Sequence, residues 1–340
     1  METKHVIIFR KSLKILLVFL LLAGLAVVFG LIGSPELSAR AFGVTFSSPF
    51  AEKFGMDPKD VYLAILDDFK VKKIRLPVYW DRIEMKEGEL DFSELDWQIS
   101  EAQKRDVKII LSIGRKLPRW PECHQPNWVL EKKDQDFEKE KLLKFLEVAV
   151  ERYRNNPALF AWQIENEPFL PFGDACPLFG KEFLDKEIAS VKKIDANHPV
   201  IITDSGELSI WVRAAKRADI FGSTMYRQIW NENLGFFTYP IPPQFFRVKL
   251  TLTKLIAGNK PVIISELQAE PWGPHQLYEE NLFPLDSQLD KLDLEKFREY
   301  ISYAEKSGFD EFYLWGVEWW YWLKTEKNHP EIWNEAKKLF

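Results

Sequence analysis

The stretch Leu159-Phe-Ala-Trp-Gln-Ile-Glu-Asn-Glu-Pro168 decides which fold the sequence predicts. Its apolar first half has the length of a buried strand and lies between an Asn-Asn-Pro turn and Pro168. Apart from Gln163, its polar residues are the Glu165-Asn166-Glu167 triplet at the carboxyl end. A buried carboxylate is costly unless it is paired, so strand formation alone does not explain this triplet. The alternative is a strand that runs out into a solvated acidic loop, and the rest of the chain must decide between the two.

Strand-like and helix-like segments alternate from Phe42 to the end of the chain, which is typical of βα units on a parallel sheet. We therefore expect one (β/α)8 barrel over residues 42–340, with a doubly wound open sheet as the alternative. No phosphate-loop or dinucleotide-binding glycine pattern follows the first strand, which favours the barrel. The expected strands are Phe42–Ser47, Lys73–Tyr79, Lys108–Gly114, Phe160–Glu167, Val200–Asp204, Ile220–Tyr226, Val262–Glu266 and Glu311–Gly316. The expected helices are Val61–Phe69, Glu94–Arg105, Lys139–Arg154, Lys181–Lys193, Ile210–Arg217, Phe245–Ile256, Leu294–Ser307 and Glu331–Leu339.

The N-terminus predicts a membrane anchor. Residues 1–14 are basic, and residues 15–32 form an almost unbroken apolar run of near spanning length. Positive charge before the run predicts a cytoplasmic N-terminus, with residues 33–41 as a linker and residues 42–340 outside the cytoplasm. A signal peptide that is cleaved, leaving a secreted protein, is the alternative.

Composition narrows the class of partner. Beyond residue 40 the chain carries 41 basic and 49 acidic residues, a net charge of −8, which argues against nucleic acid. The five histidines are scattered, and the two cysteines are too few for a structural zinc site, so we expect no metal and no cofactor. Thirteen tryptophans are a large number, and on loops their flat rings suit sugars.

Several chemically useful residues end the expected strands. In a (β/α)8 barrel these carboxyl ends meet at one face, where catalysis takes place. A second buried strand, Pro-Val-Ile-Ile-Ser-Glu-Leu, ends in Glu266 just as the fourth ends in Glu167. The full set at the strand ends is Arg75, Asn166, Glu167, Tyr226, Glu266 and Trp315.

Two carboxyl groups across a barrel mouth suit cleavage of a glycosidic bond, which needs a proton donor and an anion at the anomeric carbon. Arg75 and the Tyr226 hydroxyl are expected to keep Glu266 ionised as the nucleophile. Glu167, against Trp162 and the apolar wall, is expected to be the protonated acid/base. Each supporting residue also has a structural alternative: an internal ion pair for Arg75, core packing for Tyr226 and Trp315, and a strand cap for Asn166.

With these residues in place, the chain resembles the clan A glycoside hydrolases, which are retaining (β/α)8 enzymes. The resemblance implies that Asn166-Glu167-Pro168 carries the acid/base and that Ile264-Ser265-Glu266 carries the nucleophile. It also matches the clan's Arg, Tyr and Trp on strands two, six and eight, and the second-strand segment Ile74–Glu84. The chain departs from the clan's cellulase-like family at Thr224, where a His is usual, and strand three ends without a His, so the family stays open.

Aromatic residues and cysteines around the mouth complete the expected site. Some of the loop tryptophans should stack on sugar rings, and Trp80, Trp120 and Trp272 are the chosen candidates. His124 is either a substrate contact or a loop hydrogen-bonder. Cys123 and Cys176 fall on neighbouring βα loops, so we expect a disulfide between them. The remaining loop tryptophans are Trp128, Trp211, Trp230, Trp319, Trp320 and Trp322.

The sequence thus predicts a membrane-anchored, retaining glycoside hydrolase that cleaves the glycosidic bonds of an extracellular poly- or oligosaccharide, and we expect these bonds to be β-linked. Two alternatives remain open at this point: a non-catalytic barrel that binds carbohydrate at the cell surface, and a transglycosylase that uses the same two glutamates.

Overall fold

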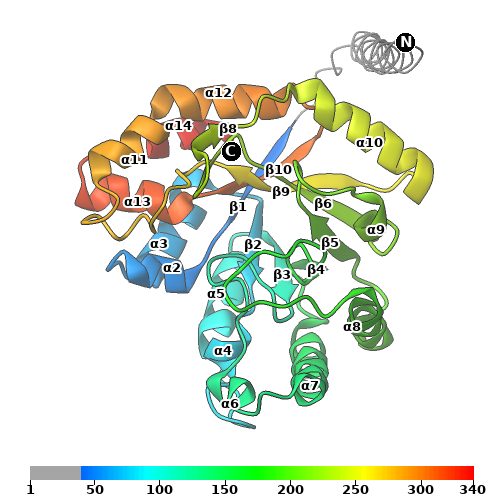
Figure 1. The fold of residues 1–340 in the computed structure, drawn as a ribbon. Helices are drawn as coiled ribbons and strands as arrows, with labels where there is room; N and C mark the ends of the chain where they lie inside the picture. The colour runs from blue at the N-terminus through cyan, green and yellow to red at the C-terminus, as the bar shows by residue number, and fades with distance from the viewer. Residues whose placement is uncertain (1–39) are drawn as a thin grey trace, which may run out of the picture.

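The computed structural model describes residues 40–340 and forms a closed barrel of eight parallel strands (Figure 1). The ring order is β1-β10-β9-β6-β5-β4-β3-β2, so the predicted (β/α)8 barrel is confirmed. The strands are β1 (Ala41–Thr45), β2 (Lys73–Pro77), β3 (Lys108–Ile113), β4 (Leu159–Ile164), β5 (Val200–Asp204), β6 (Ile220–Met225), β9 (Val262–Gln268) and β10 (Glu311–Trp315).

The strands are apolar on both faces because one face packs inside the barrel and the other packs under helices. A small inner cluster fills the barrel: Ile110, Ala161, Ile201, Ile220, Ile263 and Tyr313. A much larger cluster lies between the strands and the helices. The barrel is therefore a packed core rather than a pore, and polar side chains reach the surface at the carboxyl ends of the strands.

Helices surround the barrel, and most of the predicted ones are present (Figure 1). The helix expected at 210–217 shrinks to a single turn. A helix that was not predicted, α13, buries Trp319, Trp320 and Trp322. The helices are α2 (Ser48–Lys53), α3 (Pro58–Ala64), α4 (Trp80–Ile83), α5 (Ser93–Gln103), α6 (Asn127–Leu130), α7 (Gln135–Tyr153), α8 (Lys181–Ile194), α9 (Val212–Ala215), α10 (Pro243–Ala257), α11 (Leu285–Lys291), α12 (Leu294–Glu305), α13 (Val317–Glu326) and α14 (Glu331–Ala336), with π-helical η1 (Ile65–Phe69) and 3-10 η2 (Lys337–Leu339).

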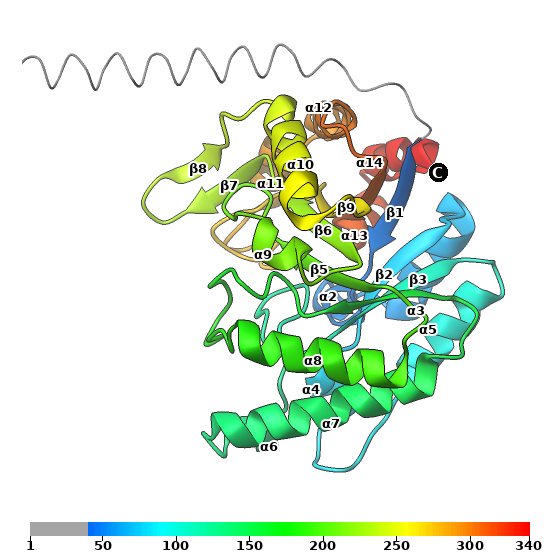
Figure 2. The ribbon, with the colours of Figure 1, turned by 90° about the vertical axis from the view of Figure 1, so that its right-hand side faces the viewer.

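An antiparallel hairpin, β7 (Gln228–Asn231) and β8 (Gly235–Thr238), follows β6 and projects beyond the barrel (Figure 2). The sequence analysis predicted no strands here; each strand is only four residues long and only partly buried. Gly235 has a φ of 66°, a left-handed conformation that glycine adopts without strain at the turn. The hairpin adds a wall on the side where the active-site residues gather.

The predicted anchor at residues 15–32, and the basic segment before it, lie outside the described residues. The linker expected at 33–41 lies almost entirely outside them as well. Within residues 40–340, no helix has both the length and the apolar character needed to cross a bilayer.

Candidate active site

Glu167 and Glu266 line one cavity of about 680 Å³ at the carboxyl ends of the strands. Glu167 lies three residues beyond the end of β4, and Glu266 lies within β9. Only 7% of Glu167 and 4% of Glu266 is exposed. Two carboxyl groups that are far apart along the chain therefore face the same space, as the sequence analysis expected.

Glu266 is held by two hydrogen-bond donors. Arg75 Nη1 lies 3.0 Å from one carboxylate oxygen, and Tyr226 Oη donates to the other at 2.9 Å. Arg75 is fully buried, and its other donors reach Gln163 at 2.7 Å and Asn166 at 2.9 Å. Burial and the negative Glu266 raise the pKa of Tyr226 well above its usual value, so its hydroxyl keeps the proton that it donates. Both contacts stabilise the ionised form of Glu266.

Glu167 lies in a different environment, which raises its pKa well above the usual value. Burial is the main cause, and the negative charge of Glu266 is the next, while Lys116 opposes the shift. The Thr224 hydroxyl lies 3.2 Å from its carboxyl group, and the Glu167 backbone N–H donates to Thr203. A carboxyl group of this kind keeps its proton near neutral pH.

The expected reason for the high pKa of Glu167 was partly wrong. Trp162 was expected to form the apolar wall beside this carboxyl group, but its indole donates to Asp195 at 2.8 Å. It belongs to the large cluster between the strands and the helices. Burial at the strand ends and the nearby Glu266 charge raise the pKa instead.

The backbone conformation after β4 points the side chains of the Glu165-Asn166-Glu167 triplet in different directions. Glu165 and Glu167 have φ values of 57° and 46°, a left-handed conformation that is costly for residues other than glycine. The Glu165 carboxylate accepts the backbone N–H groups of Arg115 and Lys116, both at 2.7 Å. Glu165 is therefore structural: it joins β4 to the loop after β3, while Glu167 is left facing the cavity.

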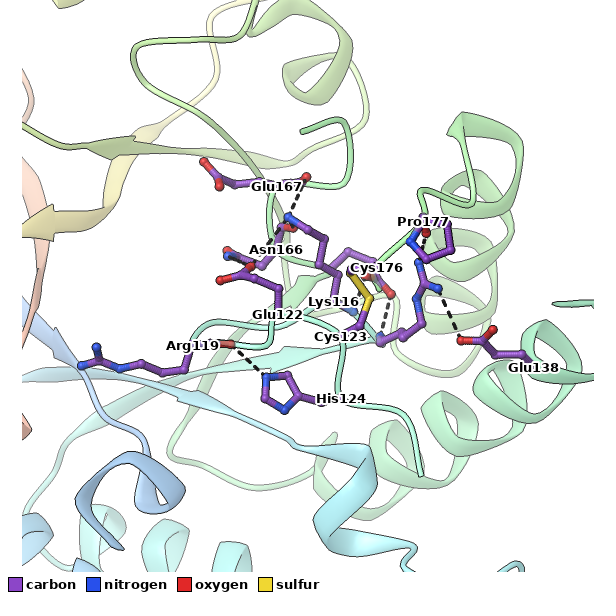
Figure 3. Close-up of a disulfide and its surroundings, with 12 residues drawn as sticks. Lys116, Arg119, Glu122, Cys123, His124, Glu138, Asn166, Glu167, Cys176 and Pro177 are labelled. Carbon is purple, nitrogen blue, oxygen red and sulfur yellow. Dashed lines mark hydrogen bonds and ion pairs between the residues drawn. A yellow bond between two sulfur atoms is a disulfide. The ribbon is translucent and has the colours of Figure 1, made fainter. Parts of the chain in front are cut away.

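Asn166 lies between the two catalytic candidates and is 2% exposed. Its side-chain oxygen accepts from Arg75, and its amide nitrogen lies 3.4 Å from Glu122. In Figure 3, Asn166, Glu122 and Glu167 point to the same side, away from the disulfide. Asn166 thus lines the cavity in a fixed orientation, as expected.

The part of the chain that carries this geometry also identifies the family. The family model described as cellulase (glycosyl hydrolase family 5) matches residues 38–245, which is more than half of the chain. The chain belongs to glycosyl hydrolase family 5. The match includes Arg75, Asn166, Glu167 and Tyr226, whereas Glu266 lies beyond it and rests on the geometry above.

The relatives of this family 5 chain include proteins named as mannosidases and as a galactosidase. A probable mannan endo-1,4-β-mannosidase A of Aspergillus niger is 26% identical over 118 residues, 33% of this chain and 30% of that protein. The β-galactosidase BgaA of Clostridium cellulovorans is 26% identical over 166 residues, 43% of this chain and 25% of that protein. The chain thus spans less than a third of either relative's length.

Solved structures share the fold of the family 5 barrel. A cold-adapted β-galactosidase from Rahnella sp. R3 has a TM-score of 0.58 at 12% identity, covering 90% of this chain and 56% of that one. An endo-1,4-β-D-mannanase from Thermotoga petrophila RKU-1 has a TM-score of 0.51 at 15% identity, covering 81% and 88%. At such low identity these likenesses bear on the fold alone.

Of the aromatic residues predicted to contact sugar in this family 5 barrel, some line the cavity and others are buried in the core. Trp120, Trp272 and Trp315 line the cavity, and so does Trp230 of the hairpin. Trp80 was predicted wrongly: it is fully buried, stacks on Phe145 at 5.7 Å and donates to Glu84. It begins α4 directly after β2, so its ring turns under the helices rather than into the mouth.

His124 also lies outside the cavity. It is buried against the Tyr79 ring at a centroid distance of 4.4 Å, and its Nε2 is 3.1 Å from the Arg119 carbonyl oxygen (Figure 3). Of the two expected roles, this placement supports the loop hydrogen-bonder and not the substrate contact.

The predicted disulfide is present. Cys123 and Cys176 are bonded, with Cα atoms 5.4 Å apart, and they join the loop after β3 to the loop after β4 (Figure 3). Because one of these loops follows the strand that leads to Glu167, the bond holds together one wall of the cavity.

The sequence analysis missed several charged residues of the cavity, among them Arg119, Glu122, Glu207 and Glu270. Burial, with Glu266 adding and Lys116 opposing, raises the pKa of Glu122 to about 7. Arg119 lies between Glu270 and Glu318, with its guanidinium 4.1 Å from the centre of the Trp315 ring. Arg119 and Glu122 lie in the loop after β3, and no sequence periodicity shows which side chains of such a loop turn inward.

Proposed function

We propose that this family 5 protein is a retaining β-glycosidase with Glu266 as nucleophile and Glu167 as acid/base. One observation carries the proposal: the cavity holds one carboxylate fixed by Arg75 and Tyr226 and one carboxyl group whose pKa is raised. Two carboxyl groups with different environments are what a double-displacement reaction on a glycoside requires.

The reaction would proceed in two steps. Glu266 attacks the anomeric carbon and forms an ester with the sugar, while Glu167 gives its proton to the leaving glycosidic oxygen. Glu167 is then an anion and removes a proton from water, whose oxygen attacks the anomeric carbon and releases Glu266. The sugar keeps its anomeric configuration, and both carboxyl groups return to their first protonation states.

The surrounding residues suit these steps. Arg75 and the Tyr226 hydroxyl would hold the Glu266 carboxylate in line with the anomeric carbon. Asn166, fixed by Arg75, offers its amide to a sugar hydroxyl. Trp230, Trp272 and Trp315 offer rings on which a pyranose can stack.

The substrate proposed is a β-linked hexoside of a poly- or oligosaccharide outside the cytoplasm. The names of the relatives point to mannan and β-galactosides as the first compounds to test. Two features support an extracytoplasmic location: the apolar run at 15–32 and the Cys123–Cys176 bond, since disulfides persist in oxidising compartments. Protease treatment of intact cells, followed by detection of the barrel, tests the location.

Kinetics with aryl β-glycosides test the mechanism. Wild type should hydrolyse at least one aryl β-mannoside or β-galactoside, and Glu266→Ala should lose nearly all of that activity. Glu167→Ala should lose about 10²- to 10⁴-fold with a poor leaving group and much less with a good one, which needs no proton. Proton NMR of the first-formed sugar should show retention. Equal rates for wild type and Glu266→Ala, or an inverted product, would contradict the assignment.

A further inference from the structure

Three loops at the barrel mouth carry aromatic residues that meet. Trp120 lies in the loop after β3, Phe172 in the loop after β4 and Trp272 in the loop after β9. In the ring order β3 and β9 are four places apart, which is the opposite side of an eight-stranded barrel. A contact between these loops therefore crosses the mouth.

The rings make that contact in sequence. Trp120 packs on Phe172 with centroids 5.9 Å apart, and Phe172 packs on Trp272 at 5.5 Å. Trp272 in turn meets Tyr226, the donor to Glu266, at 5.2 Å. We call Trp120, Phe172 and Trp272 the aromatic bridge. All three line the same cavity as the catalytic candidates.

The loops that carry Trp120 and Phe172, at one end of the aromatic bridge, are held together by a disulfide and a backbone hydrogen bond. The Cys123–Cys176 bond ties the loop of Trp120 to the loop of Phe172. The backbone N–H of Asp174 donates to the Pro121 carbonyl at 3.0 Å. Between them, Gly173 has a φ of 116°, and a Cβ there would lie 2.7 Å from the Cβ of Glu122, so only glycine fits. Phe172 is thus placed by its loop and not by its own side chain alone.

Cavity walls lie on both sides of the bridge. Phe50 and Trp315 belong to the side of β1 and β10, whereas Glu207 and Thr224 belong to the side of β5 and β6. A long polysaccharide that lay across the cavity from one of these walls to the other would have to cross the aromatic bridge, which blocks its path. A chain that either stops at the bridge or threads beneath it must enter by one of its ends.

From this geometry we infer that the site takes chain ends and short oligosaccharides and does not cut polysaccharides at internal positions. The inference rests on the proposed function and adds to it the mode of attack. Phe172 is then a specificity-determining residue, because it closes the gap between the loops of opposite strands.

The test uses the full chain and four β-1,4-linked polymers, mannan, galactan, xylan and carboxymethyl cellulose, each beside its pentasaccharide. Release of reducing ends and the fall in viscosity are followed together. We expect the pentasaccharide to be cleaved faster than its polymer, and reducing ends to appear with little loss of viscosity. A steep early fall in viscosity in the native protein, which marks random internal cuts, would overturn the inference while leaving the glycosidase proposal intact.

A variant tests the bridge itself. Phe172→Ala should raise the viscosity loss per reducing end several-fold, because the gap between the loops opens. Phe169→Ala is the matched control: Phe169 is in the same loop but packs against Arg213 and Arg217, and it should leave the ratio unchanged. Circular dichroism checks that both variants fold, and the measurement on the native protein needs no variant.

An unchanged ratio of viscosity loss to reducing ends in folded Phe172→Ala would refute the role of Phe172. If the native protein hydrolysed none of the compounds, the proposed function and this inference would both be refuted.

Discussion

Tyr226 Oη lies 2.9 Å from Oε2 of Glu266 and donates its proton to that carboxylate. The contact joins the residue just after β6 to β9, its neighbour in the barrel. It fixes one oxygen of the proposed nucleophile while Arg75 fixes the other. The orientation of Glu266 is therefore set by two side chains from different strands.

Removing this donor should slow the reaction. A hydrogen bond to a charged group contributes about 1.5–3 kcal/mol, so Tyr226→Phe should lower kcat by about 10- to 100-fold. The ring remains to pack on Trp272, so the fold should be intact. Steady-state kinetics on an aryl glycoside measure the change. A kcat equal to that of wild type would show that Tyr226 only fills space.

Thr224 should tune the pH dependence of activity. Glu167 acts first as an acid, so kcat/KM should fall as the pH rises through its pKa, which burial and Glu266 raise. The Thr224 hydroxyl lies 3.2 Å from the Glu167 carboxyl group and favours its ionised form. Thr224→Val should therefore move the alkaline limb of the pH–rate profile to higher pH. Thr224→Ser, which keeps the hydroxyl, is the control and should leave the limb in place.

Glu122 should make stability depend on pH. Burial, as the main cause, raises its pKa from the ordinary value of 4.5 to about 7. The folded protein therefore holds this proton to higher pH than the unfolded chain does. The resulting stability is fully present below the unfolded pKa and is lost as the pH rises through the folded pKa, near 7.

Glu122→Gln removes this titration. Its melting temperature, measured by circular dichroism between pH 4.5 and 8, should fall less with rising pH than that of wild type. Glu131→Gln, in the turn after α6 and exposed, is the control and should follow wild type. Parallel curves for Glu122→Gln and wild type would show that Glu122 does not titrate in this range.

The disulfide should stabilise the whole barrel. Cys123 and Cys176 are 53 residues apart, and a bond that closes a loop of this size contributes about 2–4 kcal/mol, chiefly by restricting the unfolded chain. The double variant Cys123→Ser/Cys176→Ser should unfold at a lower urea concentration. Wild type with a reductant should behave like the variant. If reduction left the midpoint unchanged, the bond would have little effect on stability.

The barrel and most of the residues at its mouth follow from the amino-acid sequence alone. Apolar runs of strand length alternate with amphipathic helices, which predicts the barrel. Because its strands are parallel, residues at their carboxyl ends all lie at the barrel mouth. Asn166, Glu167, Tyr226 and Glu266, which lie at or near strand ends, could therefore be predicted from position. Arg75 is instead the third residue of β2 (Lys73–Pro77) and reaches Glu266 through its long, buried side chain.

The directions of the side chains on loops, by contrast, depend on contacts that form in the folded protein. Glu122 turns inward, His124 turns toward Tyr79, and Trp80 turns under the helices, although all three follow strands. Their directions depend on where the disulfide and the backbone of the neighbouring loop place the chain. Contacts between loops of strands that are not neighbours in the barrel, such as Phe172 with Trp272, join segments with no shared period, so no local pattern in the sequence encodes them.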